Sequence, residues 1–166
     1  MIHIRKAILS DIPLIRLLAN EIFRYTYRII LTPEQIDYMM EWMYSAESLE
    51  RQMNEGHQFF IPEEGGEPIG YMSVQSEEED IYHLQKLYLK PSLQGKGYGK
   101  LLLKYAMEYI HSVHPHPCFM RLNVNRYNTK AVDFYTRMGM KIIHEGDFHI
   151  GHGYYMTDYI MEIEVK

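Results

Sequence analysis

Cysteine is nearly absent from this 166-residue sequence, which contains only Cys118. A single cysteine cannot form an internal disulfide, so we expect a reducing, cytoplasmic setting. Because Cys118 stands between Pro117 and Phe119, a buried apolar thiol is a better interpretation than a nucleophile.

Long hydrophobic runs are also missing. No segment reaches the roughly 18 consecutive apolar residues of a membrane helix, and the N-terminus lacks the apolar core of a signal peptide. We therefore expect no membrane partner. Apolar residues make up 46% of the chain and charged residues 23%, which is typical of a soluble globular protein. The length predicts a single domain over residues 1–166.

Basic residues are fewer than acidic ones, 17 against 22, giving a formal net charge of −5. This balance argues against a nucleic-acid partner. Four acidic residues follow one another at 77–80. A solvated loop between strands is the simpler interpretation of this run, and a field that attracts an amine or polyamine is the alternative.

Metal-ligand patterns are scarce as well. The segment HSVHPHP (111–117) has three histidines, but its two prolines predict a loop after a helix. No carboxylate or cysteine stands at ligand spacing, so we expect no metal here.

The hydrophobic periodicity predicts seven strands and five helices. The expected strands cover 2–7, 56–64, 68–76, 81–91, 118–125, 140–150 and 154–166, and the expected helices begin near Ile12, Thr32, Ala46, Tyr98 and Asn128. This order predicts a mixed sheet covered by helices. In the first helix the predicted apolar stripe is Leu14, Leu17, Leu18, Ile22 and Tyr25. In the fourth it is Leu101, Leu102, Tyr105, Met107 and Tyr109.

The turn LQGKGYGK (93–100) places three glycines in five positions between a strand and a helix. Backbone N–H groups at a helix N-terminus attract anions, glycines allow close approach, and Lys96 and Lys100 add charge. A phosphate or pyrophosphate ligand is the natural hypothesis. A Walker A loop is excluded because Gln94 and Leu101 break its spacing, and a GxGxxG dinucleotide loop is excluded by Lys100.

Gln94-x-x-Gly97-x-Gly99, after KLYLKPSL, resembles the acetyl-CoA signature of the GNAT superfamily of N-acetyltransferases. Residues 122–141 resemble the superfamily's second conserved region, a strand, an Asn and a helix with A-x-x-F-Y, although Met140 replaces the common Phe. Segments 23–53 and 148–163 more loosely resemble the PaiA-like branch, which includes polyamine acetyltransferases.

The resemblance implies an α/β (α+β) fold: a mixed, mostly antiparallel sheet with helices on both faces and a splayed central strand. It implies acetyl-CoA as co-substrate and no metal. In the family the splayed strand holds pantetheine and the glycine turn holds pyrophosphate. The cofactor-binding residues implied here are Leu87, Tyr88, Leu89, Gln94, Gly95, Lys96, Gly97, Tyr98, Gly99, Lys100, Asn128 and Tyr135. Asn128 could also serve as a helix cap.

For catalysis, Tyr135 matches the family tyrosine that can protonate the departing thiolate. Several family members carry a basic Glu six residues before the last pantetheine-holding residue, and counting back from Leu89 gives His83. Simple alternation puts His83 on one face with Leu87 and Leu89, although a bulge would shift this. A water chain through Tyr82 or Glu79, or no dedicated base, is the alternative.

These observations lead us to expect an N-acetyltransferase that acetylates a primary amine, with a small polyamine such as spermidine as the leading acceptor. The alternatives are a protein or peptide acetyltransferase and a non-catalytic acetyl-CoA-binding regulatory module. We expect the first two helices and the last hairpin to build the acceptor groove, with Tyr25, Tyr27, Trp42 and Tyr154 as candidate walls. Exposed edges of the last strands favour a homodimer.

Overall fold

The structure, a computed structural model, describes residues 1–166. Its strands are β1 (Ile2–Lys6), β2 (Gln58–Glu64), β3 (Glu67–Pro68), β4 (Gly70–Glu78), β5 (Ile81–Leu89), β6 (Cys118–Asn125), β7 (Lys141–Gly151) and β8 (Tyr154–Val165). Its helices are α1 (Ile12–Tyr27), α2 (Pro33–Tyr44), α3 (Ala46–Asn54), α4 (Tyr98–Val113) and α5 (Thr129–Arg137), with 3₁₀ turns at Leu9–Asp11 and Pro91–Leu93.

All strands belong to one sheet in the order β1-β2-β4-β5-β6-β8-β7, with β3 attached to β2. Only β5 and β6 run parallel, because α4 returns the chain between them, while all other pairs are antiparallel. The predicted α/β fold with a mixed, mostly antiparallel sheet is thus confirmed.

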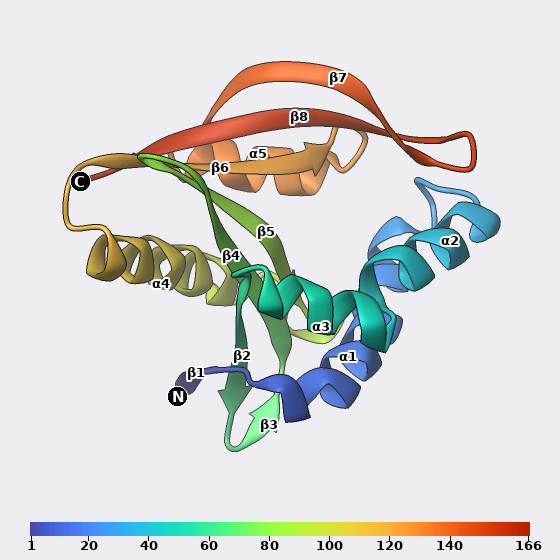
Figure 1. Cartoon of the computed structure of the whole chain (residues 1–166), viewed down its shortest axis with the longest axis horizontal. Helices are drawn as coiled ribbons and strands as arrows, with labels where there is room; N and C mark the ends of the chain where they lie inside the picture. Colours follow the sequence, from blue (N-terminus) through green and yellow to red (C-terminus); the bar gives the residue numbers. More distant parts are fainter.

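Helices cover both faces of the sheet (Figure 1). α4 and α5 bury one core, which includes Leu102, Leu103 and Tyr135, while α1, α2 and α3 bury the other, which includes Phe23 and Tyr44. The two cores lie on opposite sides of the sheet because strand residues alternate between its faces.

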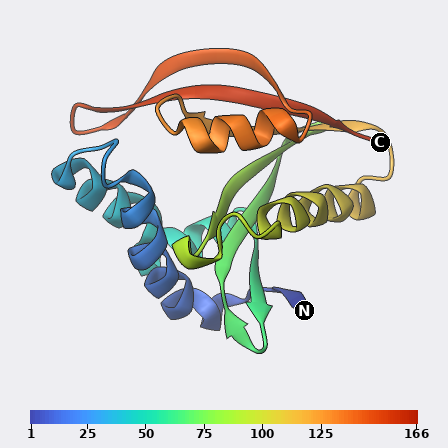
Figure 2. The ribbon, with the colours of Figure 1, turned by 180° about the vertical axis from the view of Figure 1, so that it is seen from behind.

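The centre of the sheet is splayed. β5 and β6 pair only from Ile81–His83 to Phe119–Arg121. Beyond this point β5 stays with β4 while β6 stays with β8, so the two strands diverge (Figure 2). The facing edges of both strands are therefore free of a strand partner over their second halves.

A β-bulge at Gln85 changes which residues of β5 share a face. Ser73 pairs with Lys86 and Val74 with Leu84, so Gln85 stands opposite no β4 residue in the strand register. Leu84 and Leu89 lie in the core under α4, whereas the Lys86 ammonium lies over the Phe59 ring on the opposite face. Simple alternation along β5 was therefore the wrong expectation, and His83 does not share a face with Leu89.

Two helix stripes also differ from the sequence prediction. On α1, Leu17 is 69% exposed and Tyr25 is 42% exposed, whereas Ile15, Ala19 and Phe23 are buried. α1 packs against the sheet, α2 and α3 at once, so its buried face is wider than one stripe and rotated from the predicted one. On α4, Leu101 is exposed and the buried residues are Leu102, Leu103, Ala106 and Ile110.

The β7–β8 hairpin arches over the gap and its tip reaches α2 (Figures 1 and 2). The Tyr38 hydroxyl donates to the carbonyl of Ile150 at 2.5 Å, and the Gln35 amide donates to the carbonyl of Tyr155 at 2.8 Å. Gly151 has φ +103, and a Cβ on it would overlap the Tyr38 hydroxyl. β7 is an edge strand, and the homodimer stays a prediction. None of the helices has the length and apolar character needed to cross a membrane.

Candidate active site

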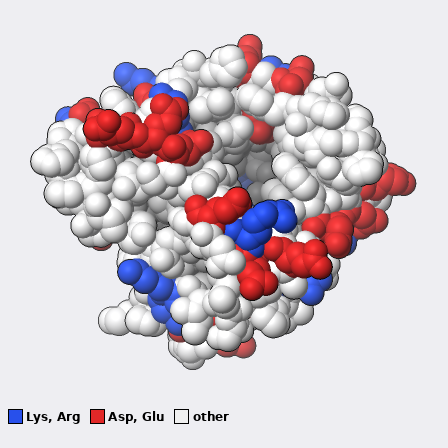
Figure 3. Space-filling model, in the orientation of Figure 1, with Lys and Arg blue, Asp and Glu red and all other residues white.

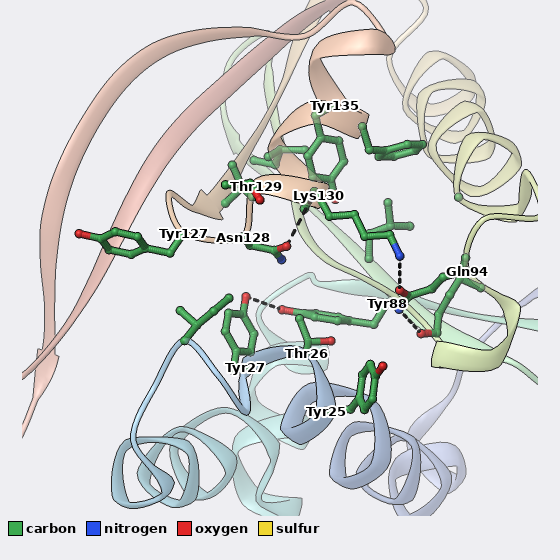
Figure 4. A pocket seen from close by; sticks show the side chains of 18 of the residues that line it. Tyr25, Thr26, Tyr27, Tyr88, Gln94, Tyr127, Asn128, Thr129, Lys130 and Tyr135 are labelled. Carbon is green, nitrogen blue, oxygen red and sulfur yellow. Dashed lines mark hydrogen bonds between the residues drawn. The ribbon is translucent and has the colours of Figure 1, made fainter.

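A cavity of about 710 Å³ occupies the gap between the diverging strands β5 and β6. Its walls come from the end of α1, from β5 and β6, from the glycine turn and from α5 (Figure 4). On the outside, a hollow with largely uncharged walls opens beneath the β7–β8 hairpin (Figure 3). The cavity volume lies in the usual range for small-molecule sites.

The glycine turn presents a row of unpaired donors to this cavity. None of the backbone N–H groups of residues 95–100 donates to an acceptor in the protein. Gly95 and Gly97 have φ +81 and +86, and a Cβ on either would meet no atom within 4 Å. Gly97 caps α4, so the positive end of the helix faces the same space. Open space, free N–H groups and a helix N-terminus fit a pyrophosphate.

Gly99 has a different reason to be glycine. A Cβ on it would lie 3.3 Å from Cζ of Phe134, which is tighter than an ordinary contact. Its missing side chain lets α4 approach α5. Two of the three glycines thus adopt a left-handed backbone, and the third permits helix packing.

The turn is anchored by Gln94, whose side-chain amide donates to the carbonyl of Leu89 at 3.3 Å and accepts from the Lys130 ammonium at 3.4 Å (Figure 4). Lys100, Lys130 and Arg137 all line the cavity. Sequence reasoning missed Lys130 and Arg137, although their spacing of seven residues along α5 could have shown that they share one face.

Lys96 and Tyr98, two predicted cofactor contacts, have side chains outside the cavity lining. The Tyr98 hydroxyl instead donates to the carboxylate of Glu64. Any contact that these two residues make with a ligand in the cavity would therefore come from their unpaired N–H groups.

The predicted pantetheine residues Leu87, Tyr88 and Leu89 all line the cavity from β5. Asn128 lines it from the start of α5 and also caps that helix, because its side chain accepts from the N–H of Ala131 at 3.4 Å. Both functions proposed for Asn128 are thus compatible with one position.

Tyr135 projects from α5 into the cavity lining and is 9% exposed. Burial raises the pKa of its phenol, and Tyr27 raises that pKa further. A phenol with a raised pKa stays protonated at neutral pH and remains a hydrogen-bond donor.

Four further tyrosines, from α1, α2, β4 and β5, form two hydroxyl pairs near the cavity. The hydroxyls of Tyr27 and Tyr88 are 3.3 Å apart (Figure 4), and the Tyr71 hydroxyl donates to that of Tyr44 at 2.8 Å. Burial raises the pKa of all four phenols. Of these four, Tyr27 and Tyr88 line the cavity and present neutral hydroxyls to it, whereas Tyr44 and Tyr71 lie behind them in the core.

The predicted acceptor walls divide into two pairs. Tyr25 and Tyr27 line the cavity, whereas Trp42 and Tyr154 pack around Tyr38 where the hairpin tip meets α2. The first helix and the hairpin thus contribute differently, since the hairpin residues brace the wall and do not form it.

His83 lies outside the cavity lining. Its Nδ1 is 2.7 Å from Oε1 of Glu77, on the sheet face opposite α4. The structure does not bring it together with Tyr135, and its role as a base stays a prediction. The acidic run 77–80 covers the end of β4 and the turn to β5, and none of it lines the cavity. Asp80 pairs with His114 at 2.8 Å.

Comparison with known proteins agrees with this geometry. The family described as "Acetyltransferase (GNAT) domain" matches residues 29–163. A spermidine N(1)-acetyltransferase of Thermoplasma acidophilum is 30% identical over 146 residues, which are 85% of this chain and 89% of that protein.

The crystal structure of the PaiA N-acetyltransferase of T. acidophilum in complex with coenzyme A superposes with a TM-score of 0.78 at 29% identity, covering 98% of both chains. The peptidyl-lysine N-acetyltransferase YjaB of Salmonella typhimurium is 34% identical over 76 residues, 46% of this chain and 44% of YjaB. The chain spans only about half the length of the YjaB proteins, since the match to the Escherichia coli protein covers 54% of it. The family match and the superposition extend over most of the chain, which therefore belongs to the GNAT acetyltransferase family.

Proposed function

We propose that this protein transfers the acetyl group of acetyl-CoA to a primary amine. One observation carries the proposal. The unpaired N–H groups of residues 95–100 and the buried Tyr135 phenol border the same cavity, between strands whose facing edges are free. One extended ligand with a pyrophosphate at one end and a reactive acyl group at the other would satisfy both features.

Each part of the cavity has a defined task in this reaction. The N–H groups of the turn, with Lys100, hold the pyrophosphate, and the free edge of β5 at Leu87–Leu89 pairs with the pantetheine amides. The amine nitrogen attacks the acetyl carbonyl, a C–N bond forms, and the C–S bond of the tetrahedral intermediate breaks. Tyr135 donates its proton to the departing sulfur and is reprotonated by the surplus proton of the attacking nitrogen.

A small polyamine is the leading acceptor. The support comes from the T. acidophilum spermidine acetyltransferase, which matches along most of the chain, and from the net charge of −5. The tyrosine-lined wall suits the alkyl stem of such an amine. The acidic run 77–80 no longer adds support, because it lies away from the cavity.

A peptide lysine is the second candidate, favoured by the match to the YjaB peptidyl-lysine acetyltransferase. Both acceptors present a primary amine on an alkyl chain, so the same chemistry serves either. A regulatory module that only binds acetyl-CoA is disfavoured, because the cavity extends beyond Tyr135 to residues of α1 and is not blocked there.

The test is release of the CoA thiol from acetyl-CoA with spermidine, spermine, an aminoglycoside, free amino acids and a lysine-containing peptide. We expect release with at least one polyamine that exceeds the amine-free rate. Release with the peptide alone would transfer the proposal to a peptide acceptor. Tight acetyl-CoA binding with no release from any amine would contradict catalysis.

A further inference from the structure

One carboxylate near the cavity is buried without a cation. Asp158 lies on β8, opposite Asn125 on β6 and Gly146 on β7, and is 5% exposed. Its Oδ2 accepts from the Asn123 amide at 3.1 Å, but its Oδ1 has no partner. The amide nitrogen of Asn125, itself only 2% exposed, also lacks an acceptor.

The nearby cation is engaged elsewhere. Arg126 donates to Glu145 and to Asp147, in both cases at 3.1 Å. A buried carboxylate with an empty acceptor position is costly, and proteins retain such groups where they have a task. Two paired residues therefore carry one open acceptor and one open donor, a combination that suits a group with several N–H bonds.

Residues bonded to Asp158 and Asn125 line the cavity. Asn123, which bonds to Asp158, lines the cavity, and so does Tyr127, whose N–H donates to the Asn125 side chain at 2.9 Å. Tyr27 lines the opposite wall and is close enough for the Asp158 charge to add to the effect of burial in raising the pKa of its phenol. Asp158 itself is not a lining residue, and it stands behind Asn123 and Tyr127 at the end of β6, beyond the point where β5 and β6 part.

We propose that Asp158, flanked by Asn123 and Asn125, is the acceptor-ammonium site and the proton acceptor of the reaction. Oδ1 accepts a hydrogen bond from the ammonium and takes one proton, leaving a neutral amine whose lone pair attacks the acetyl carbonyl. That proton passes to solvent when the acetylated product leaves. The inference rests on the proposed function and names a candidate base other than His83, which also lies outside the cavity lining.

The charges around the Asp158 carboxylate are compatible with its proposed role as proton acceptor. Burial raises the pKa of Asp158, while the Asn123 hydrogen bond and the Arg126 charge lower it. The ionisable groups that face it are Tyr27 from α1 and Arg126 after β6, and Asp147 and Glu145 of β7 are held by Arg126. A base with a raised pKa is better matched to proton transfer near neutral pH than an ordinary carboxylate.

The experiment compares wild type, Asp158→Asn and the control Asp147→Asn in CoA release with spermidine. Asp147 is a neighbouring carboxylate on β7 whose side chain is 62% exposed. We expect Asp158→Asn to lower kcat/KM for spermidine by about 10²-fold or more, while its Kd for acetyl-CoA stays near the wild-type value. We expect Asp147→Asn to keep the wild-type kcat/KM.

A second acceptor amine distinguishes a loss of proton removal in Asp158→Asn from a structural disruption of the site. A fluorinated ethylamine, mostly unprotonated at neutral pH, needs no base, so Asp158→Asn should lose far less activity with it than with spermidine. Asp158→Asn should also keep or raise Tm at neutral pH, because it removes an unpaired buried charge. An equal loss with both amines, or a lowered Tm, would assign Asp158 a structural role.

The outcomes distinguish the two proposals. A wild type that is inactive with every amine overturns the proposed function itself. An active wild type with an equally active Asp158→Asn variant overturns only the assignment of Asp158.

Discussion

Tyr135 of α5 and Lys86 of β5, on opposite faces of the sheet, show how differently burial acts on two polar side chains. Tyr135 is neutral, and burial keeps its proton on the oxygen where a thiolate would need it. Lys86 is 7% exposed on the other face, and its ammonium donates only to the side-chain oxygen Oε1 of Gln52 at 2.6 Å. Burial lowers the pKa of Lys86 to about 7. Burial thus keeps Tyr135 available as a proton donor, whereas the buried Lys86 ammonium lowers the stability of the fold.

Tyr135→Phe removes the proposed acid without changing the shape of the cavity. We expect kcat to fall by about 10²-fold or more, because the thiolate would leave unprotonated, while the Kd for acetyl-CoA changes little. Stopped-flow CoA release and calorimetric binding measure the two quantities. Tyr105→Phe, a hydroxyl deletion on α4 outside the cavity lining, is the control. Unchanged turnover in Tyr135→Phe would remove the general-acid role.

Lys86→Met should stabilise the protein in a pH-dependent way. The unfolded state binds a proton to Lys86 up to about pH 10.5, whereas the folded state loses it above about pH 7. Wild-type stability therefore rises with pH between these values, and the penalty is complete below about pH 7. We expect the substitution to raise the unfolding free energy by ~1–4 kcal/mol near pH 6 and by less near pH 10. Urea unfolding at both pH values measures this, and a loss of stability at the lower pH would contradict it.

At the scale of elements, what the sequence predicted depends on how local each feature is. The glycine turn, α4, β6 and α5 form one continuous stretch, so their order could be predicted from periodicity, and the resemblance of residues 122–141 to the family motif singled out Asn128 and Tyr135. The bulge at Gln85 could not be predicted, because it arises from how β4 and β5 pair and leaves no trace in hydrophobicity. The prediction of the buried face of α1 was wrong for a related reason, since α2 and α3 also pack on that helix.

The glycine turn gives a test with a matched control elsewhere in the chain. Gly97 and Gly66 have φ +86 and +84, and a Cβ on either would meet nothing within 4 Å. A valine at either position should cost about 1–2 kcal/mol or more of stability through the left-handed backbone. Only Gly97→Val should also abolish acetyl-CoA binding, because its side chain would stand over the free N–H groups. Binding by Gly97→Val at the wild-type Kd would refute the pyrophosphate cradle.

At the scale of the whole molecule, the proposed acceptor end of the cavity depends on segments that are remote in sequence. α1 supplies Tyr27, whereas Asp158 lies on β8 and the hairpin is braced by Tyr38 of α2. No local motif records these contacts, so the sequence could not predict this wall of the cavity, whereas the glycine turn and α5 each follow from a local pattern. Tyr25 and Trp42 illustrate this limit, because both were predicted to line the acceptor groove but only Tyr25 lines the cavity.

Gly151→Ala should loosen the hairpin from α2, because a Cβ would overlap the Tyr38 hydroxyl. We expect a lower Tm and a raised KM for the amine, with acetyl-CoA binding retained. Gly153→Ala is the matched control, since Gly153 also has a positive φ of +78 but a Cβ there would meet no atom within 4 Å. Equal effects of the two substitutions would show that backbone strain alone, and not the Tyr38 contact, matters at this tip.

In the proposed reaction, one cavity binds acetyl-CoA and a primary amine together and the acetyl group passes between them. The most direct measurement incubates the wild-type protein with acetyl-CoA and spermidine and quantifies the CoA thiol and the N-acetylated amine in the same sample. We expect both products to appear in equal amounts and to fall together in Tyr135→Phe. CoA thiol without acetylated amine would show hydrolysis in place of acetyl transfer and would refute the proposed function.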